Sequence, residues 1–493
     1  MTVSNIAPNR FAKSIYIASS ILVSGLCWYF SCGLSGDYWW LLWIAPVPVM
    51  IYSLKSTGKQ SFIISFLAYL IGRLSWFSYL VTVATIVPAI VFTLALPLVF
   101  ALIMVVVRRT IINSNSPLSI FAFPVFFTTF EFLFTTFAPD GTAGSIAYSQ
   151  SNFLPLIQIA SVTGISGITF FVTFIPSVIA LAWYHRREKM KLQYIAGVAM
   201  PIITAVLVFG IIRINAVSEN KTIKTGLAVI DEKFHYFTLH PDLKKETETA
   251  GMYAKQITLL AEQGARIVIL PERANNISNQ TDSAVLHILT AAAKQNHVTL
   301  IVGYTDFKQA SEKNSALVID ADGTLIANYN KVHLVTGLED QFTPGKEIAL
   351  FNLNGIQAGT AICKDLDFPL YIKKYAKNNL VVLFVPAWDF VVDGWLHSRM
   401  AILRGVENGF SEVRTARQGR LTISDPYGRV TYEADCSNNY GAALVGNVFL
   451  EKKSTVYTKF GDWFGIIDLI AAIFFILYAR KPRKGAATAN ATF

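Results

Sequence analysis

Long apolar runs separated by short polar stretches dominate the first 215 residues of the chain, and then they stop. A membrane span needs roughly 20 mostly apolar residues. Seven runs before residue 215 fit this pattern, and an eighth lies near the end of the chain. The pattern predicts a membrane domain of seven helices over residues 1–215 and an eighth membrane helix over 462–480. The eight runs are residues 14–36, 38–54, 61–80, 86–107, 118–137, 163–184, 192–212 and 463–479.

Residues 222–450 have a different pattern, in which short β-rich runs alternate with amphipathic segments. Asp322-Gly323 separates two such runs and is typical of a hairpin turn, and residues 425–428 (DPYG) form a second turn signature. The alternation predicts a layered α/β or α+β domain built on a sheet. The expected strands are 225–230, 266–270, 299–303, 315–319, 325–329, 359–362, 381–385, 420–424 and 430–432, and the expected helices are 246–263, 282–295 and 395–408.

The composition excludes an ordinary soluble protein. Of 493 residues, 53% are hydrophobic and only 15% are charged, whereas soluble domains carry about 25% charged residues. The 35 Phe, 20 Tyr and 9 Trp exclude a disordered chain. Four cysteines are too few for a disulfide framework in a chain of this length.

The net charge of +10 comes with a strict pattern of Lys and Arg in the loops between the predicted spans. Alternate loops contain no Lys or Arg at all: residues 33–37, the turn after Leu80, and 138–155. Basic loops lie on the cytoplasmic side, so both termini are expected inside and residues 222–450 outside, in the periplasm. The charge is therefore a topology signal and gives no support to a nucleic-acid partner. The basic set is Arg10, Lys13, Lys55, Lys59, Arg108, Arg109, Arg186, Arg187, Lys189, Lys191, Arg480, Lys481, Arg483 and Lys484.

Two ionisable residues, Arg73 and Glu131, lie within predicted spans. Such groups are costly in hydrocarbon and usually face a protein interior or a wet cavity. In a functional interpretation, Arg73 and Glu131 line a polar wall for a lipid headgroup. In a structural interpretation, they form a buried pair, or the Arg73 side chain reaches the membrane interface. The polar stretch 145–159 is expected along the outer interface rather than across the membrane.

Three polar residues of the external domain each follow a predicted strand: Glu272, Lys331 and Cys363. Strand ends are where α/β sheets gather reactive side chains. The residue types complement one another, because a cysteine needs a base to become a thiolate and a carboxylate can take that proton. A lysine supplies positive charge for a developing oxyanion. Lys331 is expected at the edge of a cleft, outside the packed core.

Histidine is not needed for this chemistry. His333 and His397 have no obvious partner in the sequence and are interpreted first as structural residues. An alternative in which His333 activates Cys363 stays open. We see no metal-ligand cluster and no dinucleotide-binding loop, so the sequence implies no metal and no cofactor.

At these three residues the sequence resembles the nitrilase, or carbon-nitrogen hydrolase, superfamily, and in its wider organisation it resembles the apolipoprotein N-acyltransferase family. The predicted order of spans, with the soluble domain between the last two, is that of this family. Several segments outside the three residues extend the resemblance: 154–160 (LPLIQIA), Thr163-Gly164, 331–335 (KVHLV), 404–409 (RGVENG) and 455–463 (TVYTKFGDW).

The resemblance implies an αββα sandwich for residues 222–450 and a role for each matching residue. Glu272 would be the general base, Cys363 the nucleophile and Lys331 the oxyanion stabiliser. Glu339 matches a second glutamate that the family uses beside the triad. Lys364 and Asp365 stand where the family usually has Tyr-Glu after the nucleophile. This difference bears on the identity of the acyl acceptor more than on the reaction at the cysteine.

A second departure lies after the first strand of the domain. Residues 229–232 (VIDE) replace the family's Gln-Gly-Asn-like stretch, and Phe234 or Phe237 stands in for a tryptophan expected nearby.

The resemblance implies a monomeric enzyme of the cell inner membrane that moves an acyl chain from a phospholipid, through a cysteine thioester, to the α-amine of a lipoprotein. That acceptor is a diacylglyceryl-cysteine at the lipoprotein N-terminus. The main alternative is a membrane-bound amidase in which water takes the acyl group. A binding protein that uses the spans alone is a third possibility, which the intact triad disfavours.

Overall fold

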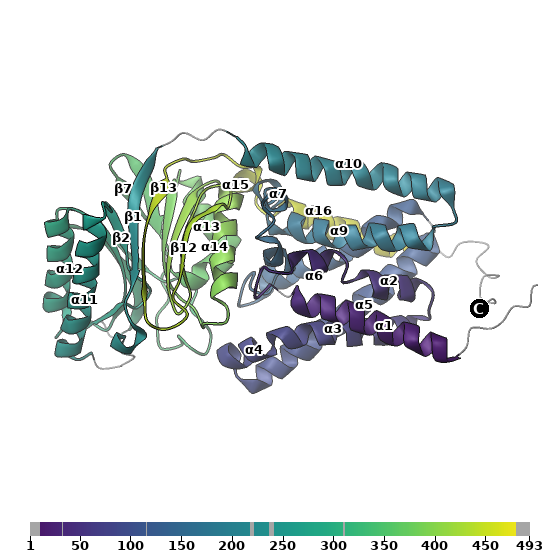
Figure 1. The fold of residues 1–493 in the computed structure, drawn as a ribbon, viewed down its shortest axis with the longest axis horizontal. Coiled ribbons are helices and arrows are strands. Elements are labelled where there is room, and N and C mark those ends of the chain that lie inside the picture. The colour runs from purple at the N-terminus through teal and green to yellow at the C-terminus, as the bar shows by residue number, and fades with distance from the viewer. Residues whose placement is uncertain are drawn as a thin grey trace, which may run out of the picture.

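The computed structural model describes residues 10–31, 33–114, 116–216, 221–235, 241–308 and 311–479. It divides into a bundle of helices and a β-sandwich, which lie end to end (Figure 1). The helices of the bundle are α1 (Arg10–Phe30), α2 (Val47–Leu54), α3 (Gly58–Arg73), α4 (Phe77–Ala84), α5 (Ile86–Ser114), α6 (Ala122–Phe137), α7 (Leu154–Ile157), α8 (Ala160–Thr163), α9 (Ile165–Tyr184), α10 (Lys189–Ile214) and α16 (Trp463–Ala479).

Several of these helices suit a membrane. Within the described residues, five continuous helical segments are long and apolar enough to cross one: Gly58–Ala84, Ile86–Ser114, Pro117–Phe137, Ile165–Tyr184 and Lys189–Ile214. Three further apolar helices are shorter, at Trp39–Leu54, Leu154–Thr163 and Trp463–Tyr478. The predicted multi-helix membrane region is thus confirmed, whereas the count of eight spans is not. The stretch 145–159 does not cross as one helix, because it breaks into η4 (Ile146–Gln150) and the short helix α7.

The basic loops gather at the end of the bundle away from the sandwich. The Nε atom of Arg108 donates to the carbonyl of Ser53 at 2.9 Å, and the guanidinium also bonds the carbonyl of Ser56. The helix α10 begins at this far end with Lys189 and runs to the sandwich (Figure 1). The predicted basic residues Arg480, Lys481, Arg483 and Lys484 lie outside the described residues.

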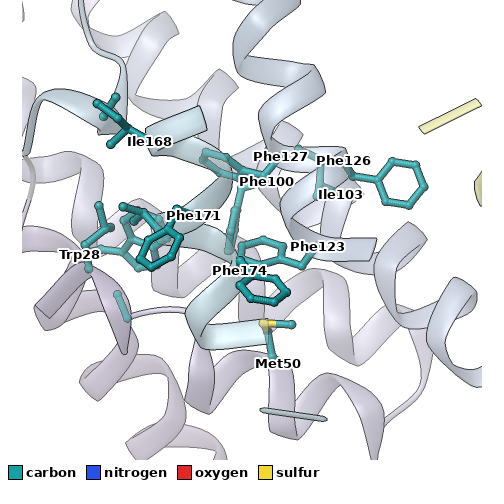
Figure 2. Close-up of a cluster of buried hydrophobic side chains, with 14 of the residues drawn as sticks. Trp28, Met50, Phe100, Ile103, Phe123, Phe126, Phe127, Ile168, Phe171 and Phe174 are labelled. Atoms are coloured by element: carbon teal, nitrogen blue, oxygen red, sulfur yellow. The ribbon is translucent and has the colours of Figure 1, made fainter. Parts of the chain in front are cut away.

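Aromatic side chains fill the interior of the bundle (Figure 2). Trp28 of α1 packs edge-on against Tyr69 of α3, with ring centroids 4.8 Å apart, and the ring of Phe100 of α5 stacks on Tyr69 at 4.6 Å. Phe123 and Phe127 of α6 complete this cluster. Close packing of this kind replaces the hydrophobic effect as the force that holds helices together in lipid.

Glu131 has a structural role inside the bundle. Its carboxylate accepts hydrogen bonds from the Ser145 hydroxyl at 3.0 Å and from the backbone N–H of Ile146 at 2.8 Å, and the Thr169 hydroxyl also donates to it. The residue therefore fixes the start of η4. Arg73 instead lies over the ring of Trp76, 4.9 Å from its centroid. Of the two interpretations, the structural one holds for Glu131, although its partners are hydroxyls and a backbone amide rather than Arg73.

The sandwich consists of two sheets with a pair of helices on each outer side. The first sheet has the order β13-β1-β2-β4-β5-β6, with β3 paired to β4, and the second has the order β12-β11-β10-β9-β8-β7. The strands are β1 (Thr222–Val229), β2 (Ile267–Ile269), β3 (Asn275–Ile277), β4 (Thr299–Asp306), β5 (Lys313–Ile319), β6 (Leu325–Asn330), β7 (Ala349–Leu353), β8 (Ile356–Thr360), β9 (Val382–Trp388), β10 (Ser411–Arg417), β11 (Arg420–Ser424), β12 (Val430–Asp435) and β13 (Ala442–Phe449).

Apolar layers hold this arrangement together. One buried cluster, which includes Leu227, Ile301 and Phe384, fills the space between the two sheets. The helices α11 (Leu243–Glu262) and α12 (Asp282–Asn296) cover the first sheet, and α13 (Pro369–Lys377) and α14 (Gly394–Asn408) cover the second (Figure 1). The order of layers is the αββα sandwich that the resemblance implied. The predicted hairpin at Asp322-Gly323 is confirmed, because β5 and β6 pair antiparallel around it.

The second sheet's helices face the membrane bundle. Leu396, Met400 and Leu403 of α14 belong to the same buried cluster as the bundle's aromatic residues. Polar contacts cross the same boundary: the Gln158 side chain donates to the carbonyl of Tyr427 at 2.8 Å, and Arg404 donates to the hydroxyl of Tyr148 at 3.1 Å. The helix α14 is therefore shared by the cores of both halves.

Candidate active site

The predicted triad lies at the ends of three strands. Glu272 follows β2, Lys331 follows β6, and Cys363 begins a 3₁₀ turn (Cys363–Asp367) after β8. The first two strands belong to one sheet and the third to the other. The site thus forms at the edge where the two layers meet.

Lys331 is buried between two carboxylates. Its Nζ lies 2.8 Å from Oε1 of Glu272 and 2.8 Å from Oε2 of Glu339. The side chain of Lys331 is only 1% exposed, so its expected position at a cleft edge is wrong. The reason is electrostatic: a buried lysine stays charged when carboxylates and hydrogen bonds replace its hydration shell.

Asn314, a residue of β5 that sequence reasoning missed, completes this group. Its Nδ2 donates to Oε1 of Glu272 and to Oε1 of Glu339, each at 2.6 Å. Its backbone carbonyl accepts from the N–H of Lys331 at 2.8 Å. The amide therefore holds both carboxylates and the lysine in one fixed arrangement. A lone Asn inside a β-rich run gives no sequence signal of this role.

The environment moves the pKa of each group in this cluster. Burial raises the pKa of Glu272, and the nearby Glu339 raises it further, against the opposing effect of Lys331. Burial alone would lower the pKa of Lys331, but Glu272 and Glu339 together raise it well above its ordinary value. The ammonium is thus charged, and Glu272 is a stronger base than an exposed carboxylate. Its Oε2 atom accepts no hydrogen bond within the described residues, which leaves it available for a proton.

Cys363 lies on a turn with an unusual backbone conformation. Its φ is +42°, in the left-handed region that non-glycine residues seldom adopt. Such conformations cost free energy and cluster at functional sites. The Sγ atom contacts the carbonyl oxygen of Trp388 at 3.5 Å. Burial and the Glu272 carboxylate raise the pKa of the thiol, so a base is needed to form the thiolate.

The two residues after Cys363 point to different partners. Oδ2 of Asp365 accepts from the N–H of Ile362 at 3.0 Å and from the hydroxyl of Tyr329 at 2.6 Å, and Oδ1 accepts from the N–H of His333 at 2.9 Å. Asp365 thus joins the turn of the cysteine to the loop after Lys331. The Nζ of Lys364 lies 2.5 Å from Asp140 of the helix bundle.

Both histidines have partners that were not obvious in the sequence. Nδ1 of His333 lies 2.9 Å from Oδ1 of Asp365, and its ring stacks on Phe368 with centroids 3.8 Å apart. His397 lies between two carboxylates: Nδ1 is 3.6 Å from Asp389 and Nε2 is 3.6 Å from Asp393. Asp365 and His333 come from different strand ends, so no spacing in the sequence indicated their pair. Asp393 precedes His397 by four residues, a helical spacing that could have indicated theirs.

Cys363, Asp389 and His397 offer three potential metal-ligand atoms within 4.8 Å of one another. Asp389, however, is already engaged, because Arg414 of β10 donates to its two carboxylate oxygens at 2.9 and 2.5 Å. Only a thiol and an imidazole remain, fewer than the three protein ligands of a catalytic zinc site. The arrangement favours an ion-paired cluster beside the cysteine over a metal centre.

Phe234 and Phe237 are the two residues proposed to stand in for a tryptophan near the start of the domain. Phe234 packs against the apolar layer beneath α11 and α12, and Phe237 lies outside the described residues. Trp388, at the end of β9, lies beside the nucleophile, because its carbonyl contacts the Cys363 Sγ. Its ring has the Arg417 guanidinium 4.2 Å from its centroid and the Arg273 guanidinium 5.5 Å away. Trp388 comes three residues after the predicted strand 381–385.

Comparisons with known proteins match both halves of the chain. The apolipoprotein N-acyltransferase N-terminal domain matches residues 24–178, and the carbon-nitrogen hydrolase family matches residues 211–438. An apolipoprotein N-acyltransferase of Geobacter metallireducens is 24% identical over 471 residues, covering 86% of this chain and 88% of the relative. That of Aquifex aeolicus is 23% identical and covers 64% of this chain and 74% of the relative.

Amidases match a smaller part of the chain. The 2-oxoglutaramate amidase of Bacillus subtilis is 26% identical over 34% of this chain and 73% of the relative. Among solved structures, an amidase of the nitrilase superfamily from Nesterenkonia AN1 covers 48% of this chain and 94% of that chain, at 19% identity and a TM-score of 0.40. The Geobacter metallireducens relative covers 86% of this chain, whereas the Bacillus subtilis amidase covers 34%.

Proposed function

Because the chain belongs to the apolipoprotein N-acyltransferase family, we propose that it transfers an acyl chain from a membrane phospholipid to a lipoprotein through a thioester on Cys363. The acceptor is the α-amine of an N-terminal cysteine that carries a diacylglyceryl group. The observation that carries this proposal is the ion pair between Lys364 and Asp140. It ties the residue next to the nucleophile to the helix bundle, from which lipid substrates would arrive.

The first half of the reaction forms the acyl-enzyme. Oε2 of Glu272 takes the proton of the Cys363 thiol, whose raised pKa makes this step necessary. The thiolate attacks the ester carbonyl, and the Lys331 ammonium stabilises the negative oxygen of the tetrahedral intermediate. The lysophospholipid then leaves. Covalent catalysis divides one difficult transfer into two easier ones.

The second half releases the acyl chain to the amine. The lipoprotein amine attacks the thioester, an amide forms, and the thiol is regenerated. Water must be a poorer acceptor than the amine for the protein to act as a transferase. A membrane-bound amidase would differ only here, and the matches to full-length acyltransferases favour the transferase.

Three further residues support this site. Glu339 helps Glu272 to fix Lys331, since both carboxylates bind the same ammonium. Asp365 holds the nucleophile turn through the N–H of Ile362. Lys364 joins that turn to the membrane bundle, in the position where the family usually has a tyrosine.

The domain organisation follows the same proposal. Residues 1–215 form the membrane domain with seven spans, residues 222–450 the catalytic domain, and residues 462–480 the eighth span. The positive loops support an orientation with both termini in the cytoplasm and the catalytic domain in the periplasm, on the outer face of the cell inner membrane. The protein acts as a monomer, with one phospholipid and one lipoprotein as its partners.

The direct test follows both products. Purified protein is incubated in detergent with a phospholipid and a peptide whose N-terminal cysteine is diacylglycerylated, and both products are measured by mass spectrometry. We expect one acyl chain on the peptide α-amine for each lysophospholipid formed. Free fatty acid in place of acylated peptide would identify an amidase-like hydrolase and overturn the transferase proposal.

A further inference from the structure

The reaction as proposed leaves a buried histidine beside the nucleophile unused. His397 lies on α14, and its ring nitrogen is within 4.8 Å of the Cys363 Sγ. Its Nε2 is 3.5 Å from the hydroxyl of Tyr79, a residue of the membrane helix α4. A side chain in contact with both the nucleophile and the bundle is placed where the lipid part of a substrate would lie.

The charges around His397 favour its protonated form. Arg414 keeps Asp389 ionised and holds its pKa below the ordinary value despite burial. Burial would lower the pKa of His397, but Asp393 and Asp389 raise it well above the ordinary value. The groups that face this imidazole are Asp389, Asp393, Cys363, Tyr79 and Asp367. Two cations act on it indirectly, Arg414 through Asp389 and Lys364 through Asp367.

The leaving group of an ester needs a proton. When the thiolate displaces the lysophospholipid, the leaving oxygen is an alkoxide, which departs readily only if an acid protonates it. Glu272 carries the thiol proton, but it comes from the first sheet, where Lys331 and Asn314 bind its Oε1. His397 lies within 4.8 Å of the sulfur and also contacts Tyr79 of the bundle, the side from which the lipid would come. Its position therefore suits the leaving oxygen better than that of Glu272.

We propose that His397 is a further catalytic residue, which protonates the leaving oxygen of the phospholipid ester and then takes a proton from the attacking amine. This role rests on the proposed acyltransferase function. In the first half, the carbon–sulfur bond forms, the carbon–oxygen bond breaks, and the His397 imidazolium gives its proton to the oxygen. In the second half, the carbon–nitrogen bond forms and the neutral imidazole takes the amine proton. The carbon–sulfur bond then breaks, and Glu272 returns its proton to the thiolate.

The position of α14 agrees with a lipid substrate that reaches Cys363 from the helix bundle. Leu396 and Met400, neighbours of His397 on the helix, pack into the bundle core. His397 therefore faces the boundary between the two halves, whereas Glu272 and Lys331 come from the sheet covered by α11 and α12. Glu272 and Lys331 thus act on the thiol and the ester carbonyl. His397 acts on the oxygen of the departing lysophospholipid and on the nitrogen of the attacking amine.

The test compares two acyl donors in the His397→Gln variant. Single-turnover thioester formation is measured with a phospholipid and with a p-nitrophenyl ester of the same acyl chain, whose phenolate leaves without protonation. The exposed His287→Gln variant is the matched control. We expect the phospholipid rate to fall by about 10²-fold or more, the usual contribution of a general acid, with the p-nitrophenyl rate nearly unchanged.

Other outcomes are informative in different ways. Equal loss with both donors, or loss with neither, would overturn the role of His397. A wild-type protein that acylates Cys363 from the p-nitrophenyl ester but not from phospholipid would instead overturn the proposed function.

A second variant covers the case in which His397→Gln does not fold. In Asp393→Asn the imidazole stays, but a carboxylate that raises its pKa is lost. The alkaline limb of the phospholipid acylation rate should then move to lower pH. An alkaline limb that stays in place would contradict the proposal.

Discussion

The ammonium of Lys331 lies 2.8 Å from the Glu272 carboxylate, and the two side chains are 1% and 3% exposed. A third charged group, Glu339, lies on the same ammonium at 2.8 Å. This geometry gives the cluster two properties at once. It fixes the base and the oxyanion stabiliser relative to each other, and it makes the site costly to dismantle, because any single loss leaves a buried charge without its partner.

Lys331→Ala should reduce both activity and stability. Loss of an oxyanion donor costs about 10²–10³ in rate, and loss of one partner of a buried ion pair costs about 3–5 kcal/mol of unfolding free energy. Thioester formation in a single turnover and thermal unfolding check the two effects. Lys331→Arg should recover little, since a planar fork does not replace a compact ammonium. The exposed Lys294→Ala variant should change neither, and a wild-type rate in Lys331→Ala would remove this residue from the mechanism.

Glu339→Gln should shift the acid limb of the acylation rate to lower pH. The base must be ionised to take the thiol proton, and the negative charge of Glu339 raises the pKa of Glu272. Removing that charge lowers the pKa, so Glu272 stays ionised to lower pH. The pH dependence of single-turnover acylation measures this. A shift in the opposite direction would show that Glu272 is not the group that titrates.

Arg414→Met should destabilise the catalytic domain by about 3–5 kcal/mol, because it leaves the fully buried Asp389 carboxylate without its bidentate partner. Arg420 of the neighbouring strand provides a matched control. It pairs with Glu433 but is 28% exposed, so Arg420→Met should cost about 1 kcal/mol or less. Denaturant unfolding of both variants gives the comparison, and similar losses would contradict the assigned role of Arg414.

The proposed topology can be tested with a membrane-impermeant thiol reagent in a Cys363→Ala background. A cysteine placed at the exposed Gln280 of the sandwich should be labelled from the periplasmic side of intact inner membranes. A cysteine at the exposed Lys59, in the first turn of α3 beside the basic loop, should be labelled only after the membrane is opened. Reversed labelling would show that the orientation inferred from the loop charges is wrong.

The chemistry-bearing strand ends could be predicted from sequence because each follows a short apolar run. The strand β10 could not, although it is entirely buried. Its residues 411–417 (SEVRTAR) include Glu412, Arg414 and Arg417, which read as a polar loop. The two arginines are tolerated because carboxylates from distant segments pair with them: Asp389 with Arg414, and Glu232 with Arg417. The strands β3, β7 and β13 and the helix α13 were missed as well.

The same limit applies to the site. Asn314 contacts Glu272, which follows another strand of the same sheet, and His397 contacts Tyr79 across the boundary with the bundle. No local pattern in one sequence carries such contacts. The residues that could be predicted were Cys363, Lys331 and Glu272, because each is a reactive residue type that follows a predicted strand. The resemblance to a family was needed to join them.

The most direct test of the central claim is mass spectrometry of the protein after incubation with phospholipid alone. The proposed thioester predicts one added acyl mass on the peptide that contains Cys363, its release by neutral hydroxylamine, and its transfer to a diacylglyceryl-cysteine peptide added later. Cys363→Ala should gain no acyl mass, and the buried Cys436 should stay unmodified in both proteins. An acyl group on another residue, or peptide acylation by Cys363→Ala at the wild-type rate, would contradict the account.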